Sequence, residues 1–108
     1  YDSIMAGDIS KEDDAVAKDY AQKGGCRATN LADLARIYHQ LVDKSSDAVT
    51  RYDYVLKTID CYNSAVGKDS NAARARFTEK RVDMDAVAKN YNANLSKFQQ
   101  AVSDSMNF

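Results

Sequence analysis

Apolar residues recur through most of the chain at the spacing of amphipathic helices. The clearest stripe follows Asn30, a favoured N-cap residue, and consists of Leu31, Leu34, Ala35, Tyr38, Leu41 and Val42. A second stripe lies between Ser45-Ser46 and Gly67, and its members are Val49, Tyr52, Val55, Leu56, Ile59, Tyr62 and Val66. Because the two serines supply only a short turn, the two segments are predicted to form an antiparallel helical hairpin.

Two further helical segments flank this hairpin. The first begins at Ser10, which acidic residues follow in the first turn, and it should end at Gly24-Gly25. The last begins at Asp69-Ser70 and carries an apolar seam of residues seven apart: Phe77, Met84, Tyr91 and Phe98. A single helix from Asn71 to Met106 would be about 54 Å long. We therefore expect this segment either to break near Asp83 to Asp85, where a polar cap is available, or to project and meet a partner.

These segments predict an all-α protein: an up-and-down bundle of four helices with a long C-terminal helix, in one domain spanning residues 1–108. The chain has 108 residues and no proline, so helices can run without interruption. Cys61 lies nearly opposite the Tyr52, Leu56, Ile59 stripe, on a second face with Tyr54, Thr58 and Ala65. The third helix should therefore be covered on two sides, as in a bundle.

The only two cysteines are placed at similar distances from the predicted hairpin turn. Cys26 precedes Ser45 by 19 residues and Cys61 follows Ser46 by 15, so antiparallel helices bring the two sulfurs to similar heights. A Cys26–Cys61 disulfide would stabilise the fold by roughly 3–4 kcal/mol on the chain-entropy model. Since such bonds persist in oxidising compartments, the pair predicts a secreted or periplasmic protein.

Charge and hydropathy restrict the partners. The chain has 15 basic and 16 acidic residues, which argues against general affinity for nucleic acid. The uninterrupted apolar runs are only a few residues long, far short of the roughly 20 that a membrane-spanning helix needs.

Catalytic and metal chemistry have little support in the sequence. His39 is the only histidine, and no second soft ligand stands at zinc-like spacing from it. We interpret it as a histidine beside the apolar stripe of its helix, with a pH-sensitive contact as the alternative. No glycine-rich phosphate loop or redox motif is present, and the acidic run Glu12-Asp13-Asp14 suits a first helical turn. We therefore predict a protein without catalytic residues, metal or cofactor.

The densest positive stretch is the strongest candidate for partner binding. It consists of Arg74, Arg76, Lys80 and Arg81, and it includes one acidic residue, Glu79. Arginine forks suit carboxylates, so this stretch is a candidate for gripping an acidic protein surface; a solvated helix face is the alternative. Tyr54 is a second candidate, either as an exposed interface anchor or as a residue packed against the first helix. Asn94-Leu95-Ser96 also matches the N-glycosylation sequon.

Together these features predict a non-enzymatic, exported binding protein that acts through a protein partner, as an inhibitor, an immunity-type protein or an accessory protein. One alternative is a carrier that holds a small apolar or aromatic ligand in the bundle interior. Small residues at expected core positions leave room either for such a cavity or for close helix approach: Ala35, Ala48, Ala73 and Ala88. Another alternative is a structural subunit that self-assembles, for example as a homodimer through the C-terminal helix.

Overall fold

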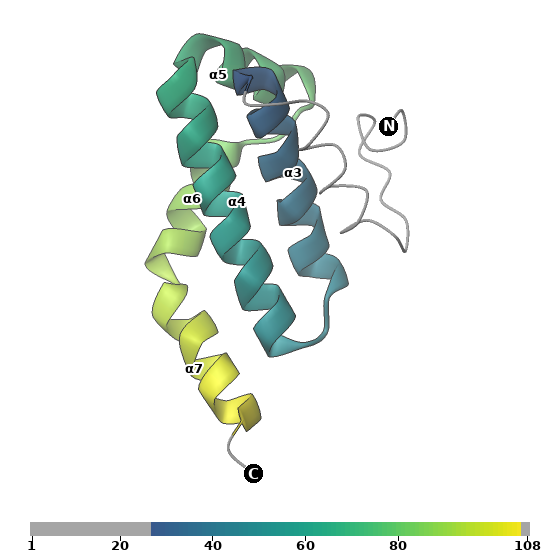
Figure 1. Ribbon diagram of the computed structural model, residues 1–108, viewed down its shortest axis with the longest axis vertical. Coiled ribbons are helices and arrows are strands. Elements are labelled where there is room, and N and C mark those ends of the chain that lie inside the picture. The colour runs from purple at the N-terminus through teal and green to yellow at the C-terminus, as the bar shows by residue number, and fades with distance from the viewer. Residues whose placement is uncertain (1–26, 107–108) are drawn as a thin grey trace.

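The computed structural model describes residues 27–106, which form five α-helices (Figure 1). In chain order these are α3 (Ala28–Lys44), α4 (Ala48–Lys68), α5 (Ser70–Glu79), α6 (Met84–Ala93) and α7 (Leu95–Met106). No strand occurs among the described residues, so the predicted all-α class is confirmed and the helices pack as a bundle. The helix expected from Ser10 to Gly24, and Cys26, lie outside the described residues.

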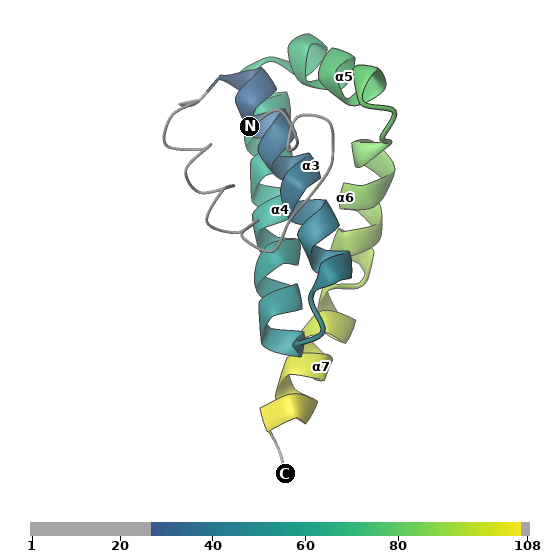
Figure 2. The same cartoon turned by 90° about the vertical axis from the view of Figure 1, so that its right-hand side faces the viewer.

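The predicted hairpin is formed by α3 and α4, which run antiparallel and side by side (Figures 1 and 2). Asp47 caps the start of α4, because its carboxylate Oδ2 accepts hydrogen bonds from the amide and the hydroxyl of Thr50, both at 2.8 Å. α4 continues to Lys68, directly after Gly67. The hairpin turn therefore lies where Ser45-Ser46 predicted it.

The single long C-terminal helix is the main error of the sequence-based prediction. The segment after Asp69 forms three helices instead of one, and the first break falls between Glu79 and Met84. This confirms the alternative of a break near Asp83. α5 lies over the end of the hairpin that is remote from the Ser45-Ser46 turn, and α6 and α7 run back along the hairpin (Figure 2). The chain thus gains a bend that a continuous helix would lack.

The core consists of two neighbouring clusters of buried side chains. One contains the larger residues of the hairpin and α6: Leu34, Ile37, Tyr38, Leu41, Val42, Tyr54, Val55 and Tyr91. The other lies toward α5 and is rich in alanine: Ala32, Ala35, Ala65, Ala73, Phe77 and Met84. Cys61 is half-buried and packs against both clusters. The seam prediction is confirmed for Phe77, Met84 and Tyr91, whereas Phe98 is only partly buried.

The buried face of α4 differs from the predicted stripe. Val49 and Leu56 are 48% and 40% exposed, whereas Tyr54, Thr58 and Ala65 on the second face are buried. The small side chain of Ala65 belongs to the alanine-rich cluster with Ala32 and Ala35 of α3, and small residues let two helices approach closely. The second face of α4 therefore packs inward, and Val49 and Leu56 on the predicted stripe turn toward solvent.

The Cys26–Cys61 disulfide is not shown by the structure. Cys61 is the only cysteine among the described residues, and it is a free thiol there. The pKa of this thiol is raised to about 11, mainly by burial and then by the charge of Asp60, while Lys57 opposes the rise. The bridge, and the secreted or periplasmic location inferred from it, remain predictions. None of the helices within residues 27–106 combines the length and the apolar character needed to cross a membrane.

Candidate functional site

Two of the sequence-predicted binding residues, Arg74 and Arg81, line one hollow where α5 turns into α6. We call it the α5–α6 hollow; its volume is about 460 Å³. Its lining combines apolar and charged residues: Arg74, Phe77, Thr78, Arg81, Val82, Asp83, Met84 and Asp85. Phe77 and Met84 are buried in the alanine-rich cluster, so they form a floor that the folded core holds in place.

The turn beneath this hollow is a Schellman motif. The amide of Val82 donates to the carbonyl of Phe77, and the amide of Arg81 donates to the carbonyl of Thr78, both at 3.1 Å. In this motif the residue after the C-cap adopts a left-handed conformation, which glycine usually occupies. Here that residue is Arg81, with φ of 57°, and it is the one non-glycine residue with positive φ in the described part of the chain. The motif projects a charged side chain from the turn.

Asp83 completes the turn by starting α6. Its carboxylate Oδ1 accepts a hydrogen bond from the amide of Ala86 at 3.1 Å, so it is the N-cap residue. Val82 packs against the same cluster that contains Phe77, as expected for the apolar contact of a Schellman motif. Caps on both sides of residues 80–83 therefore fix the shape of the hollow and the direction of α6.

Arg74 is held against one wall of the hollow by polar contacts. Its Nε lies 3.4 Å from Oδ2 of Asp85, and its Nη1 donates to the hydroxyl of Ser70. The hydroxyl of Tyr62 on α4 donates to the other oxygen of Asp85. The pKa of Tyr62 is raised, first by burial and then by its hydrogen bond to Asp85, and Arg74 opposes that rise. Arg74 is thus partly neutralised, although about half of its side chain remains exposed.

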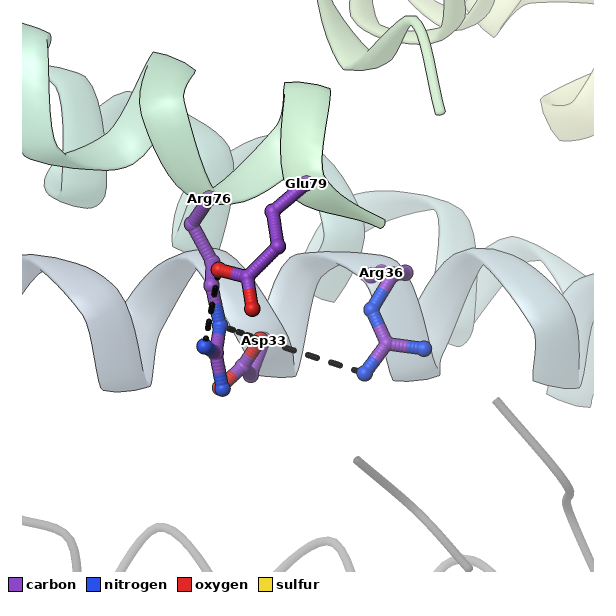
Figure 3. A network of polar contacts seen from close by, with 4 residues as sticks. All are labelled: Asp33, Arg36, Arg76 and Glu79. Atoms are coloured by element: carbon purple, nitrogen blue, oxygen red, sulfur yellow. Dashed lines mark hydrogen bonds and ion pairs between the residues drawn. The ribbon is translucent and has the colours of Figure 1, made fainter. Parts of the chain in front are cut away.

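Arg76, one of the sequence-predicted binding residues, is engaged within the fold by Asp33 and Glu79. Figure 3 shows its guanidinium reaching from α5 to Asp33 on α3. Nε and Nη2 donate to Oδ1 and Oδ2 of Asp33 at 2.9 and 3.0 Å, and Nη1 donates to Glu79 at 3.2 Å. These hydrogen bonds raise the pKa of Arg76, with Asp33 as the main cause. Arg36 also lies near Asp33, at 3.8 Å. The function of Arg76 is to tie α5 to α3.

Lys80 and Arg81 differ from the other two cations of the stretch. Neither forms an ion pair with any carboxylate in residues 27–106, and Arg81 is exposed on the turn. The positive stretch of the sequence is therefore divided by the fold. Arg76 faces inward, Arg74 is paired at the wall, and Lys80 and Arg81 carry the uncompensated charge.

Tyr54 is buried rather than exposed, so it is not the exposed interface anchor that was one alternative; the first helix, named in the other alternative, lies outside the described residues. Its ring stacks on Tyr38 at 5.9 Å between centroids and is 8% exposed. The ammonium of Lys57 lies 5.7 Å from the ring of Tyr54 and 5.5 Å from that of Tyr38. Tyr54 lies on the side of α4 that faces α3.

His39 makes a specific contact that the sequence did not reveal. Its Nδ1 lies 2.6 Å from the hydroxyl of Tyr91, which links α3 to α6. The pKa of His39 is lowered because burial penalises the imidazolium, while the charge of Asp43 partly opposes this. Across residues 27–106 no group of three or more His, Cys, Asp or Glu side chains is arranged to hold a metal ion.

Sequence reasoning missed the partners that organise this end of the bundle. Asp33 stands between Ala32 and Leu34 on a helix whose neighbouring positions are apolar, which is itself a sign of a buried carboxylate that needs a cation. Nothing in the sequence pattern pairs Tyr62 with Asp85, because the contact exists only once the chain bends at Arg81.

Asn94 of the glycosylation sequon caps the end of α6, and its side-chain amide donates to two oxygens of Asn90.

Comparisons with known proteins give no match: no family model matches the chain, and no curated protein or solved structure is detectably similar to it. Function must therefore be inferred from the chemistry of the site.

Proposed function

We propose that this is a non-enzymatic binding protein that recognises a protein partner through the α5–α6 hollow. The observation that carries the proposal is Arg81, an exposed cation at a left-handed position directly beside the apolar floor of Phe77 and Met84. Glycine at this position would avoid a steric cost of roughly 1–2 kcal/mol. A side chain that the local fold disfavours is a reason to look for a function there.

The chemistry of the hollow fits an acidic segment that presents one apolar side chain. Arg81 and Lys80 supply charge that no carboxylate in the described part of the chain neutralises. Asp83 and Asp85 line the same hollow, so they repel a carboxylate from their side and direct it toward Arg81. An apolar side chain of the partner would cover Phe77 and Val82. Such a combination of apolar centre and charged rim is typical of protein interfaces.

In this proposal the protein is exported and acts as an inhibitor, an immunity-type protein or an accessory protein. The export part depends on the predicted Cys26–Cys61 bridge and is independent of the hollow. A bridged bundle without catalytic residues would present a rigid surface, which lowers the entropic cost of binding.

The test is affinity capture from an extracellular or periplasmic extract, followed by association kinetics with the purified partner. Arg81→Glu should slow association at low salt by about tenfold and reduce its salt dependence, because a steering charge is reversed. Lys89→Glu changes the net charge equally on the exposed surface of α6 and should have a much smaller effect. Equal association rates for the original protein and Arg81→Glu at both salt concentrations would contradict the proposal.

A second candidate, self-association through the C-terminal helix, is favoured by the exposure of α7. No residue of α7 is buried, although its apolar residues fall at helical spacing: Leu95, Phe98, Val102 and Met106. Val49 and Leu56 of α4 are also exposed, and α7 packs on α4. Sedimentation of the full chain over a wide concentration range tests this candidate, and a monomer throughout would exclude it.

The interior-carrier alternative gains no support from two of the four alanines that suggested it. Ala35 and Ala73 are fully buried in one cluster with Ala32 and Ala65, which favours close helix approach over a ligand cavity in the core.

A further inference from the structure

A second hollow lies toward the opposite end of the bundle, where the start of α4 meets the junction of α6 and α7. We call it the α4–α7 hollow; its volume is about 440 Å³. Three elements and the hairpin turn contribute to its lining, which consists of Ser46, Ala48, Arg51, Asn90, Asn94, Lys97, Phe98 and Ala101. Apart from Ala48, none of these residues was a candidate for ligand binding on sequence grounds alone, because they are spread over 56 positions of the chain.

The charge of this hollow is positive on both sides. Arg51 comes from α4 and Lys97 from α7, and neither forms an ion pair within residues 27–106. No carboxylate lines the hollow, in contrast to the α5–α6 hollow with its two aspartates. The neighbouring Asp47 is occupied as the cap of α4. Two cations from different helices therefore face one space without an internal counter-ion, which favours an anionic ligand.

Side-chain amides add neutral hydrogen-bonding groups at the same place. The Nδ2 of Asn94 donates to the carbonyl and to Oδ1 of Asn90, at 2.7 and 2.8 Å, and this fixes both amides at the α6–α7 junction. The Nδ2 of Asn90 makes no hydrogen bond within the described part of the chain, so it remains available as a donor. Donors that the fold holds in place fix the orientation of a bound ligand and make the site specific for it.

The apolar wall of the hollow is a fixed aromatic ring. Phe98 packs edge-on against Tyr91, with ring centroids 5.9 Å apart and an interplanar angle of 83°. Tyr91 is buried and is in turn held by His39. Ala48 and Ala101 are small, so they leave space in front of the ring. A flat apolar group can therefore lie against Phe98 without displacing a larger side chain.

We propose that the α4–α7 hollow binds a small organic anion, with a carboxylate held between Arg51 and Lys97 and a flat apolar body against Phe98. The volume of about 440 Å³ lies in the range of small-molecule sites, about 300–1,000 Å³. The site is on the surface between helices, unlike the interior cavity considered above. It shares no lining residue with the α5–α6 hollow, so this proposal does not depend on the proposed protein partner.

The experiment is an amide NMR titration of the full, isotope-labelled chain with naphthoate, an aromatic carboxylate. Saturable shifts should centre on Asn90, Asn94 and Phe98. Two analogues should each bind at least about tenfold more weakly. Naphthamide is uncharged and cannot pair with Arg51 and Lys97, and inorganic phosphate has no apolar body to lie against Phe98. Naphthoate binding should also weaken by about tenfold or more when Arg51→Gln and Lys97→Gln are combined.

A matched control combines Lys68→Gln with Lys89→Gln, which removes the same charge from exposed residues outside the α4–α7 hollow. This double variant should bind naphthoate as the original protein does. Phe98→Leu should weaken naphthoate binding but leave the weak phosphate binding unchanged. The proposal is overturned if naphthoate causes no saturable shifts at the hollow, if naphthamide or phosphate binds equally well, or if both double variants lose the same affinity.

Discussion

Arg76 and Asp33, 43 residues apart in the chain, form a two-point ion pair that fastens α5 to α3. The side chain of Asp33 is 2% exposed, whereas that of Arg76 is 20% exposed. A carboxylate so deeply buried loses its hydration, and parallel hydrogen bonds from a guanidinium are the geometry that best offsets that loss. This pair sets where α5 lies on the hairpin, and α5 carries the first half of the Schellman turn below Arg81.

Removing the charge of Asp33 should destabilise the fold strongly. Asp33→Asn turns one acceptor into a donor facing the guanidinium, so we expect unfolding free energy to fall by about 2–4 kcal/mol. Urea denaturation followed by circular dichroism measures the change. Glu79→Gln is the control, because this partner of Arg76 is 62% exposed and should contribute no more than about 1 kcal/mol. If the two variants lost similar amounts of unfolding free energy, the Arg76–Asp33 pair would not be the main interaction that holds α5 on α3.

Arg81→Gly should stabilise the protein, because glycine adopts the left-handed conformation of this turn without a steric penalty. The expected net gain is about 0.5–1 kcal/mol in unfolding free energy, because the relieved steric cost of roughly 1–2 kcal/mol is offset in part by the entropy that glycine adds to the unfolded chain, and the same denaturation measures it. Lys80→Gly is the matched control, since Lys80 has φ of −87° and gains nothing from glycine. If both variants lost stability, the turn would not depend on the left-handed residue. The gain in stability should be accompanied by weaker partner binding if Arg81 is retained for recognition.

The fold was predictable from sequence as far as local patterns determine it. The hairpin followed from helical periodicity and from two serines, and the buried seam of Phe77, Met84 and Tyr91 followed from spacing alone. The break after Glu79 was foreseen only as an alternative, because Arg81 carries no sequence signal for a left-handed turn such as glycine would give. The inward face of α4 was also missed, since alanine and threonine pack closely without being strongly hydrophobic.

The candidate site was less predictable than the fold. A run of cations in the sequence shows where positive charge lies, but it does not show which of those cations are paired with carboxylates. That pairing depends on residues distant in the chain, such as Asp33 and Asp85. Tyr54 was assigned two possible roles because helical phase alone does not say which face meets α3. Arg51 and Lys97 are 46 positions apart and gave no pattern at all, although the fold places them around one hollow.

Cys61 should be a slowly reacting thiol in the folded, reduced protein. With a pKa of about 11, only about one part in a thousand is thiolate near pH 8, and half-burial limits access further. A chromogenic disulfide reagent should therefore react with Cys61 far more slowly before denaturation than after it. Rapid reaction of both cysteines in the folded, reduced protein would contradict this.

The predicted Cys26–Cys61 bridge is tested by the same reagent on denatured protein that has not been reduced. The bridge predicts no reactive thiol there, and reduction should then lower the melting temperature. Two reactive thiols would remove both the bridge and the reason for placing the protein in an oxidising compartment.

His39 should make stability depend on pH in the mildly acidic range. Burial lowers its pKa below the ordinary value of 6.5, so the unfolded chain binds a proton at a pH where the folded protein does not. The stability is therefore fully present above about pH 6.5 and is lost as the pH falls toward the lowered pKa. Asp43 opposes the effect by favouring the imidazolium, and it also acts on Tyr91, whose pKa is raised to about 12, mainly by burial.

Unfolding free energies measured from about pH 7.5 down to about pH 5.5 check this linkage, since that window avoids most carboxylate titration. The original protein should lose stability across the window, whereas His39→Gln should vary much less because it has no imidazole to protonate. Tyr91→Phe should cost about 0.5–1.5 kcal/mol at the upper end by removing the hydroxyl that meets Nδ1 at 2.6 Å. If His39→Gln kept the full pH dependence, another group would be responsible, and the contact between α3 and α6 would be insensitive to protonation.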